Sequence, residues 1–310
     1  MISLDDVQAA AARIAPMVRR TPLLAADQLK QPITRADLAL KLECLQVSGS
    51  FKARGAANRL MSLSPEERAR GLVAASGGNH GLAVARCGFL AGVPATIFLP
   101  DSVAPEKVAK MQAWGAHTHV DGASFDDCNR LALELSAREG ATYVHPFADP
   151  FVVAGQGTVA LEMLEDRPGT DTVLIAIGGG GFVTGAGTAI KALDPAIKVV
   201  GVEPVGSPTL YRSLEAGQVV ALPSITSAVP TMSCLRTDDR LFAQARQVID
   251  EVVLIEDADM TRAADWLWFE LGIAADPAGA AAVAALMSGA YKPRDGERIT
   301  VPVCGAGLPG

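Results

Sequence analysis

The sequence is poor in several residue types, and each shortage excludes a class of protein. Five cysteines occur, far apart and odd in number, and no two form a C-x-x-C pair: Cys44, Cys87, Cys128, Cys234 and Cys304. This pattern supports neither a disulfide scaffold nor a zinc knuckle, and it is typical of a protein of the reducing cytoplasm. Aromatic residues make up 5% of the chain, so stacking platforms for bases or sugars are scarce.

Positive charge is also scarce. The 310 residues include 27 Lys and Arg against 34 Asp and Glu, a net charge of −7, and no basic cluster is present. Nucleic-acid binding is therefore not expected. The acidic start, Met1–Asp6, has no apolar run, so we expect no signal peptide. A hydrophobic share of 49% excludes intrinsic disorder, and the length suggests roughly two domains of about 100–200 residues each.

Long apolar runs are limited to one stretch. Residues 173–190 contain no charged side chain over 18 positions, which is the lower limit for a membrane span. The stretch contains six glycines, however, and each disfavours a helix by about 1 kcal/mol relative to alanine. We therefore expect no membrane span but a buried strand, a glycine loop and the start of a helix.

Several motifs of catalysis and ligand binding are missing as well. The chain has no Gly-Lys dipeptide, hence no Walker A loop, and no G-x-S-x-G elbow. The dinucleotide fingerprint G-x-G-x-x-G fits no frame of the glycine run. His117 and His119 form an H-x-H in a predicted strand, but no carboxylate stands at ligand spacing. This is a weak metal signal.

Short β-type runs alternate with longer helical patterns along the chain. This alternation predicts an α/β fold of parallel βαβ units with helices on both sheet faces. Ser3 is predicted to cap a first helix, with acidic residues in its first turn. The predicted strands are 38–44, 71–75, 95–99, 117–120, 141–144, 172–177 and 198–202, and helices are predicted at 81–90, 104–114 and 124–139.

The run Gly178-Gly179-Gly180-Gly181 is the strongest single feature. It follows an apolar strand and precedes a helical segment. Consecutive glycines let backbone N–H groups converge, and a helix start adds partial positive charge, so the run predicts a phosphate cradle. A tight turn is the alternative, but a turn needs one or two glycines rather than four.

Three further features stand between predicted elements. Lys52, in Ser48–Gly55, begins a helix, where a lysine can act as nucleophile or base; alternatively it lies on a solvated basic face with Arg54 and Arg59. The loop Ser76–Gly81 suits an anion such as a carboxylate, or it is a capping loop with Asn79 as N-cap. Cys304 closes an apolar strand; the alternative is a buried structural thiol.

The combination of a lysine, a phosphate cradle and a carboxylate loop is what a pyridoxal phosphate amino-acid enzyme requires. The chain resembles the fold-type II pyridoxal phosphate enzymes (tryptophan synthase β-like), in particular the serine/threonine dehydratase and serine racemase branch. The resemblance spans nearly the whole chain. Its motifs are Lys41-Leu42-Glu43, Gly49-Ser50-Phe51-Lys52, Ser76-Gly77-Gly78-Asn79-His80-Gly81, Ala154-Gly155-Gln156-Gly157-Thr158, the four glycines and Pro277-Ala278-Gly279-Ala280.

The resemblance implies roles for particular residues. Lys52 would join the cofactor covalently and later remove the Cα proton of the substrate. The cofactor would be bound by Phe51, Lys52, Asn79, Gly178, Gly179, Gly180, Gly181, Phe182 and Cys304, with Cys304 facing the pyridine nitrogen. The substrate carboxylate would be bound by Ser76, Gly77, Gly78, Asn79 and His80.

The resemblance also implies a reaction. A neutral group at Cys304 favours elimination over a long-lived carbanion, so we expect removal of water from a β-hydroxy amino acid of the L-threonine or L-serine type, giving a 2-oxo acid and ammonia. The alternatives are a racemase, a cysteine synthase-like β-replacement enzyme and a non-catalytic binding protein. Gly77 stands where racemases carry a serine. Asp276 replaces a family glutamate, and the segment 224–234 departs from the family pattern.

The implied architecture has two open parallel-sheet αβα domains with the active site in the cleft between them. Residues 1–70 and 148–310 would form the large cofactor-binding domain, and residues 71–147 the small domain with the Asn79 loop. Glu203 is a weak candidate for a divalent cation, because Thr209 stands where the family offers an aspartate. A cytoplasmic homodimer is expected, and no regulatory domain is expected after Gly310.

Overall fold

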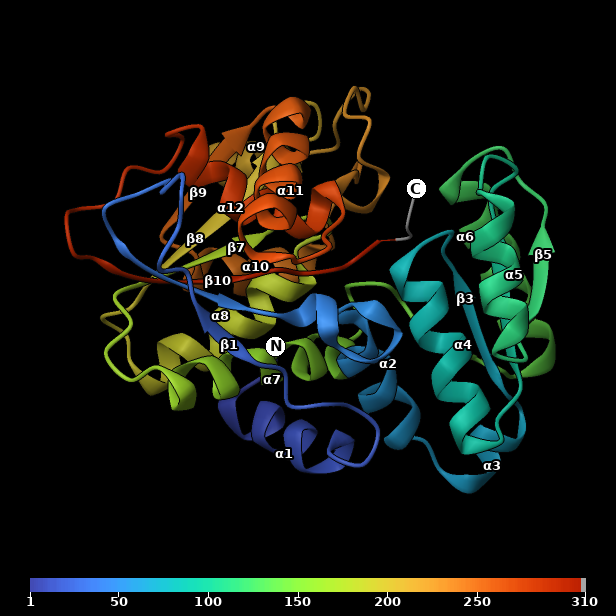
Figure 1. Cartoon of the computed structure of the whole chain (residues 1–310). Helices are drawn as coiled ribbons and strands as arrows, with labels where there is room; N and C mark the ends of the chain where they lie inside the picture. The colour runs from blue at the N-terminus through green and yellow to red at the C-terminus, as the bar shows by residue number, and fades with distance from the viewer. Residues whose placement is uncertain (308–310) are drawn as a thin grey trace.

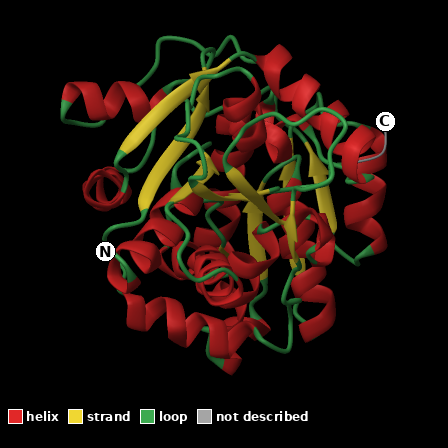
Figure 2. Cartoon of the chain, turned by 60° about the vertical axis from the view of Figure 1, so that its left-hand side comes forward, coloured by secondary structure: helices red, strands yellow, loops and turns green. Residues whose placement is uncertain are grey.

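The computed structural model describes residues 1–307 and contains two β-sheets, each flanked by helices (Figure 1). Both sheets are visible as separate groups of strands in Figure 2. The larger sheet has the strand order β1 (Leu23–Ala25), β2 (Asp37–Lys41), β10 (Arg298–Pro302), β7 (Thr172–Ala176), β8 (Lys198–Pro204) and β9 (Glu251–Ile255). The smaller sheet has the order β5 (His117–Val120), β4 (Ala95–Leu99), β3 (Leu72–Ala75) and β6 (Thr142–Tyr143).

All pairs of neighbouring strands are parallel except β1 with β2, which is antiparallel. The helices are α1 (Leu4–Ile14), α2 (Lys52–Met61), α3 (Pro65–Ala69), α4 (Asn79–Ala91), α5 (Pro105–Ala113), α6 (Phe125–Glu139), α7 (Pro150–Asp166), α8 (Gly181–Leu193), α9 (Thr209–Ala216), α10 (Asp239–Val248), α11 (Asp257–Leu271) and α12 (Pro277–Met287). The predicted α/β fold with parallel sheets is confirmed. The predicted cap is also present, because the Ser3 hydroxyl accepts the Asp6 N–H at the start of α1.

The larger sheet is buried on both faces, which explains why its strands are apolar throughout. Successive side chains of a strand point to opposite faces. On β7, Leu174 joins the core formed with α11 and α12, whereas Val173 and Ile175 join the core formed with α7 and α8. The uncharged stretch 173–190 is therefore β7, a glycine loop and α8, as predicted. None of the helices in residues 1–307 is long and apolar enough to cross a membrane.

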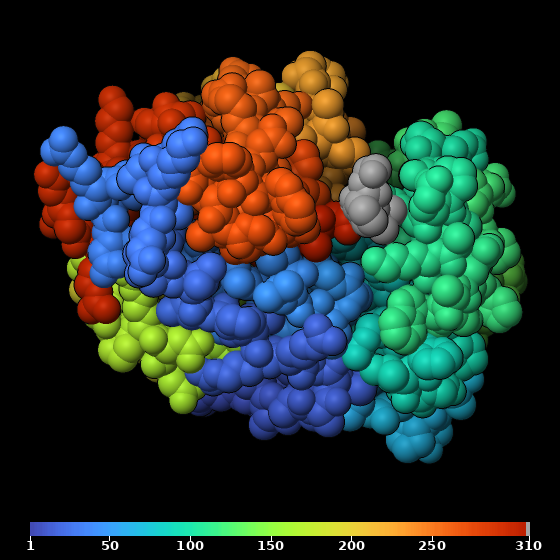
Figure 3. All heavy atoms as spheres, in the orientation of Figure 1, coloured from blue at the N-terminus to red at the C-terminus, as the bar shows by residue number. Residues whose placement is uncertain are grey.

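The smaller sheet follows the same rule with a different set of helices. Leu72 and Ala74 of β3 face the core that contains α4, and Val73 and Ala75 face the core beneath α6. The core on the α4 side also takes in Leu60 of α2, so it joins the two parts of the molecule. In the space-filling view, the residues of the smaller sheet and its helices form a lobe at one side (Figure 3). The domain boundaries at 70/71 and 147/148 stay a prediction.

Candidate active site

A cavity of about 70 Å³ lies where the carboxyl ends of strands from both sheets meet. In open parallel sheets this is the edge at which ligands bind. Segments that follow β7, β10, β3 and β6 all contribute to the wall. The lining residues are Phe51, Lys52, Asn79, Phe147, Ala176, Gly178, Gly179, Gly180, Gly181, Phe182, Thr231, Met232, Asp276, Ala278, Gly279, Cys304 and Gly305.

Lys52 lies at the first position of α2, as its place in the sequence predicts. Its Nζ donates a hydrogen bond of 2.7 Å to the carbonyl oxygen of Pro146. Within residues 1–307 no carboxylate pairs with this amine, and burial lowers the pKa of Lys52 to about 8. A substantial fraction of the amine is therefore unprotonated near neutral pH, which is the form that acts as nucleophile or base. The alternative of a solvated lysine on a basic face is wrong.

The four glycines form the turn between β7 and α8. Gly180 has a φ of +97° and precedes the first helical residue, Gly181. Among the described residues, the backbone N–H groups of these four glycines find no hydrogen-bond acceptor. A Cβ at Gly179 would lie 2.3 Å from the ring of Phe147, and one at Gly181 would lie 2.4 Å from its carbonyl oxygen. Close packing therefore requires glycine at both positions, and it leaves N–H donors free at a helix start.

Aromatic rings and a thiol complete the wall near Lys52. The rings of Phe51 and Phe182 stack with centroids 4.2 Å apart. Cys304 is buried, and burial raises the pKa of its thiol, so the group is neutral. The Cys304 Sγ lies 3.5 Å from the carbonyl oxygen of Pro302, to which it donates. It closes β10, where the sequence predicted an apolar strand ending in cysteine.

The loop between β3 and α4 contributes only Asn79 to the cavity lining. The N-cap of α4 is Gly78, and Asn79 is the first helical residue without a side-chain cap, so the alternative of Asn79 as N-cap is wrong. The Ser76 hydroxyl accepts the Gly78 N–H at 3.2 Å. His80 is buried, its Nε2–H donates to the Val144 carbonyl, and burial lowers its pKa to about 3. That Ser76, Gly77, Gly78 and His80 bind substrate stays a prediction.

These residues fit pyridoxal phosphate. The cofactor needs an amine for its aldehyde, N–H donors for its phosphate and apolar surface for its ring. The cavity offers the Lys52 amine, the unpaired N–H groups of Gly178–Gly181 and the stacked rings of Phe51 and Phe182. The family model of pyridoxal-phosphate dependent enzymes matches residues 14–305.

The chain belongs to the pyridoxal-phosphate dependent enzymes. Among relatives of this family, an L-threonine ammonia-lyase of Thermotoga maritima is 37% identical over 288 residues, 93% of this chain and 72% of the relative. A catabolic L-threonine dehydratase of Staphylococcus aureus is 33% identical over 99% of this chain and 90% of the relative. The predicted resemblance to the dehydratase and racemase branch is confirmed.

Solved structures of this family have the same fold. A maize serine racemase superposes with a TM-score of 0.94 at 32% identity, covering 99% of this chain and 94% of the racemase. A threonine deaminase from the bacterium abbreviated T.th. gives a TM-score of 0.91 at 35% identity, covering 98% of both chains. The chain is therefore a pyridoxal phosphate enzyme of fold type II.

Several lining residues of this pyridoxal phosphate enzyme were not among the predicted site residues. Asp276 is the N-cap of α12, and its carboxylate accepts the Gly279 N–H. Burial raises the pKa of Asp276, and the Asn79 amide and the Gly279 N–H lower it. The run Asp276-Pro277-Ala278-Gly279 is a recognisable helix start, which was the available signal. Phe147 and Met232 lie in irregular segments and reach the cavity only through tertiary packing.

The weak metal candidate Glu203 is occupied by backbone donors. Its two carboxylate oxygens accept the N–H groups of Leu210 at 2.8 Å and Tyr211 at 2.7 Å, in the first turn of α9. Burial raises the pKa of Glu203 to about 8. Thr209 and Ser207 both donate to the Cys234 carbonyl. Within residues 1–307, no group of three or more His, Cys, Asp or Glu side chains is arranged to hold a metal.

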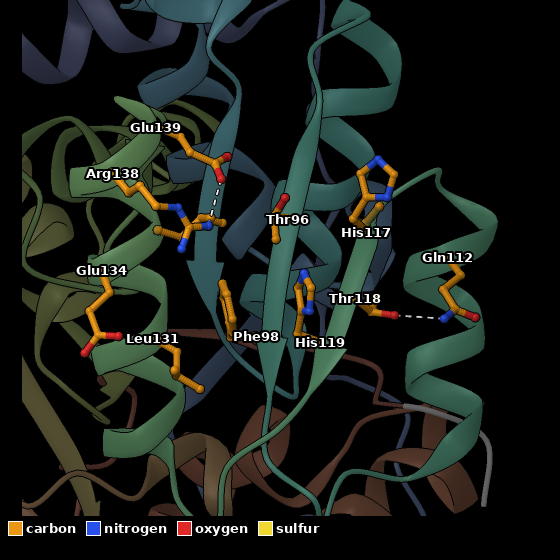
Figure 4. Close-up of a pocket in the computed structure, with 12 residues that line it drawn as sticks. Thr96, Phe98, Gln112, His117, Thr118, His119, Leu131, Glu134, Arg138 and Glu139 are labelled. Carbon is orange, nitrogen blue, oxygen red and sulfur yellow. Dashed lines mark hydrogen bonds and ion pairs between the residues drawn. The ribbon is translucent and has the colours of Figure 1, made fainter.

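A second, larger hollow of about 710 Å³ lies on the smaller sheet, between β4, β5 and the flanking helices (Figure 4). It includes the H-x-H pair of β5. The ring of His119 stacks on Phe98 with centroids 4.9 Å apart, and His117 points to the same side of the strand. Its lining contains no lysine and no glycine loop, so it does not offer the groups that the cofactor needs.

Proposed function

We propose that this chain is an ammonia-lyase that removes water from a small β-hydroxy amino acid, with L-threonine or L-serine as substrate. The products are a 2-oxo acid and ammonia. The observation that carries the proposal is the Lys52 amine, which has no carboxylate partner among the described residues and lies in the cavity that the four glycines also line. The names of the Thermotoga maritima and Staphylococcus aureus relatives support the choice of threonine.

The division of labour follows from the chemistry of each group. When bound, pyridoxal phosphate supplies an electron-withdrawing ring that acidifies the Cα–H of an amino acid joined to it. We propose that the N–H groups of Gly178–Gly181 bind the phosphate and that Phe51 and Phe182 cover the ring. Lys52 takes the Cα proton on its Nζ. Asn79, with Ser76, Gly77, Gly78 and His80, binds the substrate carboxylate or the ring hydroxyl.

The neutral thiol of Cys304 favours elimination over other outcomes. A thiol opposite the ring nitrogen adds no negative charge that would hold a proton there, so charge from Cα is better discharged by loss of the β-hydroxyl. Water leaves from Cβ, and the released enamine reacts with water to give the 2-oxo acid and ammonia.

Racemisation needs a second proton donor on the opposite face of Cα. Gly77 has no side chain, and a Cβ there would lie 3.1 Å from the Val103 Cγ2, so a larger residue would have to displace Val103. The structural similarity to a serine racemase makes inversion the second candidate, and it is tested together with elimination.

We further propose a homodimer that works in the cytoplasm. Trp268 and Phe269 of α11 are 65% and 61% exposed, which is a large apolar area for a monomer surface. The five cysteines of the described residues are all free thiols, as a reducing compartment allows.

The test combines covalent trapping with a substrate panel. Borohydride reduction of the enzyme with bound cofactor, followed by peptide mapping, should label Lys52 and no other residue. The enzyme should convert L-threonine or L-serine into 2-oxo acid faster than it inverts either, and Lys52→Ala should abolish both activities. A label on another lysine, or inversion with little 2-oxo acid, would contradict the proposal.

A further inference from the structure

His145 lies just after β6, where the chain crosses from the smaller sheet to α7, and its imidazole ties a turn together. The ring Nδ1 accepts the N–H of Phe147 at 3.2 Å and the N–H of Ala148 at 2.9 Å. Only an unprotonated Nδ1 can accept hydrogen bonds. Burial lowers the pKa of His145 to about 4; Asp238 raises it and Lys52 lowers it. The ring is therefore neutral at physiological pH and acts as an acceptor.

The turn held by His145 touches two parts of the site at once. The Pro146 carbonyl accepts the hydrogen bond from the Lys52 Nζ. One residue later, Phe147 packs on the glycine loop so closely that neither Gly179 nor Gly181 has room for a Cβ. A shift of the turn would therefore move the lysine's partner and the packing surface of the predicted phosphate cradle together.

The imidazole is held in place by its neighbours. The His145 ring meets the Phe147 ring edge-on, with centroids 4.6 Å apart and an interplanar angle of 88°. It also meets Tyr143 edge-on at 5.9 Å and 87°. Rotation of the imidazole would break both ring contacts and both hydrogen bonds to Nδ1, so the ring fixes the geometry of residues 146–148.

We propose that His145 is a positioning residue for the reaction, because its Nδ1 fixes the turn whose Pro146 carbonyl orients the Lys52 amine. An amine that donates one N–H to a carbonyl directs its lone pair away from that oxygen, which leaves the lone pair available to the cavity that Lys52 lines. This inference rests on the proposed role of Lys52. It assigns to His145 no proton transfer and no contact with substrate.

Three variants separate this role from general stability. His145→Asn places an amide oxygen close to the position of Nδ1 and keeps the acceptor. His145→Gln places its amide oxygen one bond farther out, and His145→Ala removes the acceptor. His117→Asn, on the exposed edge strand β5, is the matched control for a histidine away from the turn.

The measurements are kcat and KM, the melting temperature, and the rate at which cofactor-free protein captures pyridoxal phosphate, followed by the absorbance of the lysine adduct. We expect His145→Gln and His145→Ala to lower kcat and the capture rate by about 10- to 100-fold, with a smaller change in KM. His145→Asn should stay near the wild type in both rates. A purely structural role would lower the melting temperature without this split between Asn and Gln.

Two results would overturn the inference. One is a wild-type-like capture rate and kcat in folded His145→Gln or His145→Ala; the other is a loss in His145→Asn as large as in His145→Ala. If the variants do not fold, ¹⁵N NMR of the wild-type holoenzyme decides, because a protonated Nδ1 on His145 would exclude the acceptor role. Failure of borohydride to label Lys52 would instead refute the proposed function.

Discussion

Burial sets the protonation state of the side chains around Lys52. It lowers the pKa of Lys52 to about 8 and that of His145 to about 4, and it raises the pKa of the Cys304 thiol. The same loss of hydration thus produces an available amine, a neutral imidazole and a neutral thiol. The site needs no dedicated base beside the lysine, because the apolar surroundings deprotonate it in part.

The lowered pKa of Lys52 predicts a pH-dependent cost to the stability of the cofactor-free protein. The unfolded lysine holds its proton up to about pH 10.4. Below pH 8 the folded protein carries a buried charge, and between pH 8 and about 10.4 the unfolded state binds more protons, so stability rises with pH. Lys52→Met should therefore raise the free energy of unfolding by about 2–3 kcal/mol at pH 7, a gain that shrinks toward zero as the pH rises.

Urea unfolding of both proteins from pH 7 to 10.5 checks this expectation. Lys292→Met, at an exposed lysine, controls for the removal of a positive charge as such. A gain for Lys52→Met that stays constant over the whole range would show that packing, not the buried charge, causes it.

Helix α2 is held in place by a buried group of charged residues just behind Lys52. The Arg54 guanidinium pairs with both oxygens of Glu43, at 2.8 and 2.7 Å, and also with both oxygens of Glu162 of α7. Lys41 at the end of β2 pairs with Glu162 at 2.8 Å. Arg54 and Glu43 are almost fully buried. The motif Lys41-Leu42-Glu43 thus connects the strand, α7 and the helix that begins with Lys52.

Removal of Arg54 should be strongly destabilising, because it leaves Glu43 buried without a partner. We expect Arg54→Ala to lower the free energy of unfolding by about 3–5 kcal/mol. Arg130→Ala, which breaks the exposed pair with Glu134 on α6, should cost less than about 0.5 kcal/mol. Denaturant unfolding measures both. Equal, small losses would mean that water or a neighbouring cation compensates Glu43.

Local patterns predicted elements well where burial alone decides them. The strands 95–99 and 117–120 have the predicted bounds, and helix 124–139 begins one residue later, because Ser124 is its N-cap. The predicted strand 38–44 ends at Lys41 instead. There the chain turns into a 3-10 helix from Glu43, whose carboxylate reaches Arg54. Such a long-range ion pair leaves no periodic signal in the sequence.

The site was predictable to the extent that its residues stand in local motifs. Lys52, Asn79 and the four glycines begin helices after strands or loops, so they were identified in advance. Phe147 and Thr231 reach the cavity from irregular segments. Their positions depend on how residues far apart in sequence pack, such as Phe147 against Gly179. The three-residue strand β1 is partly exposed and pairs antiparallel, so it too lacked a pattern.

At the scale of the molecule, the two sheets share one hydrophobic cluster built largely of small residues. Ala56 and Ala57 of α2 meet Ala83 and Ala85 of α4 in this core. Small side chains leave few interlocking knobs, and packed helices can slide by small amounts at such a contact. The chain passes between the sheets at α3 and at residues 144–149, and the second passage carries the turn of His145. We therefore propose that residues 71–147 move as a unit.

Closure of this unit should follow binding of an amino acid at the Asn79 loop. L-Alanine has no β-leaving group, so it can occupy the loaded enzyme without elimination, and we expect it to lower the radius of gyration and to slow amide exchange in residues 76–81 and 144–149. Acetate, a carboxylate without an amine, should produce a smaller change at the same concentration. X-ray scattering and hydrogen-exchange mass spectrometry measure the two effects. Superimposable scattering curves with unchanged exchange in both segments would show that the two sheets form one rigid body, with substrate entering a preformed cavity.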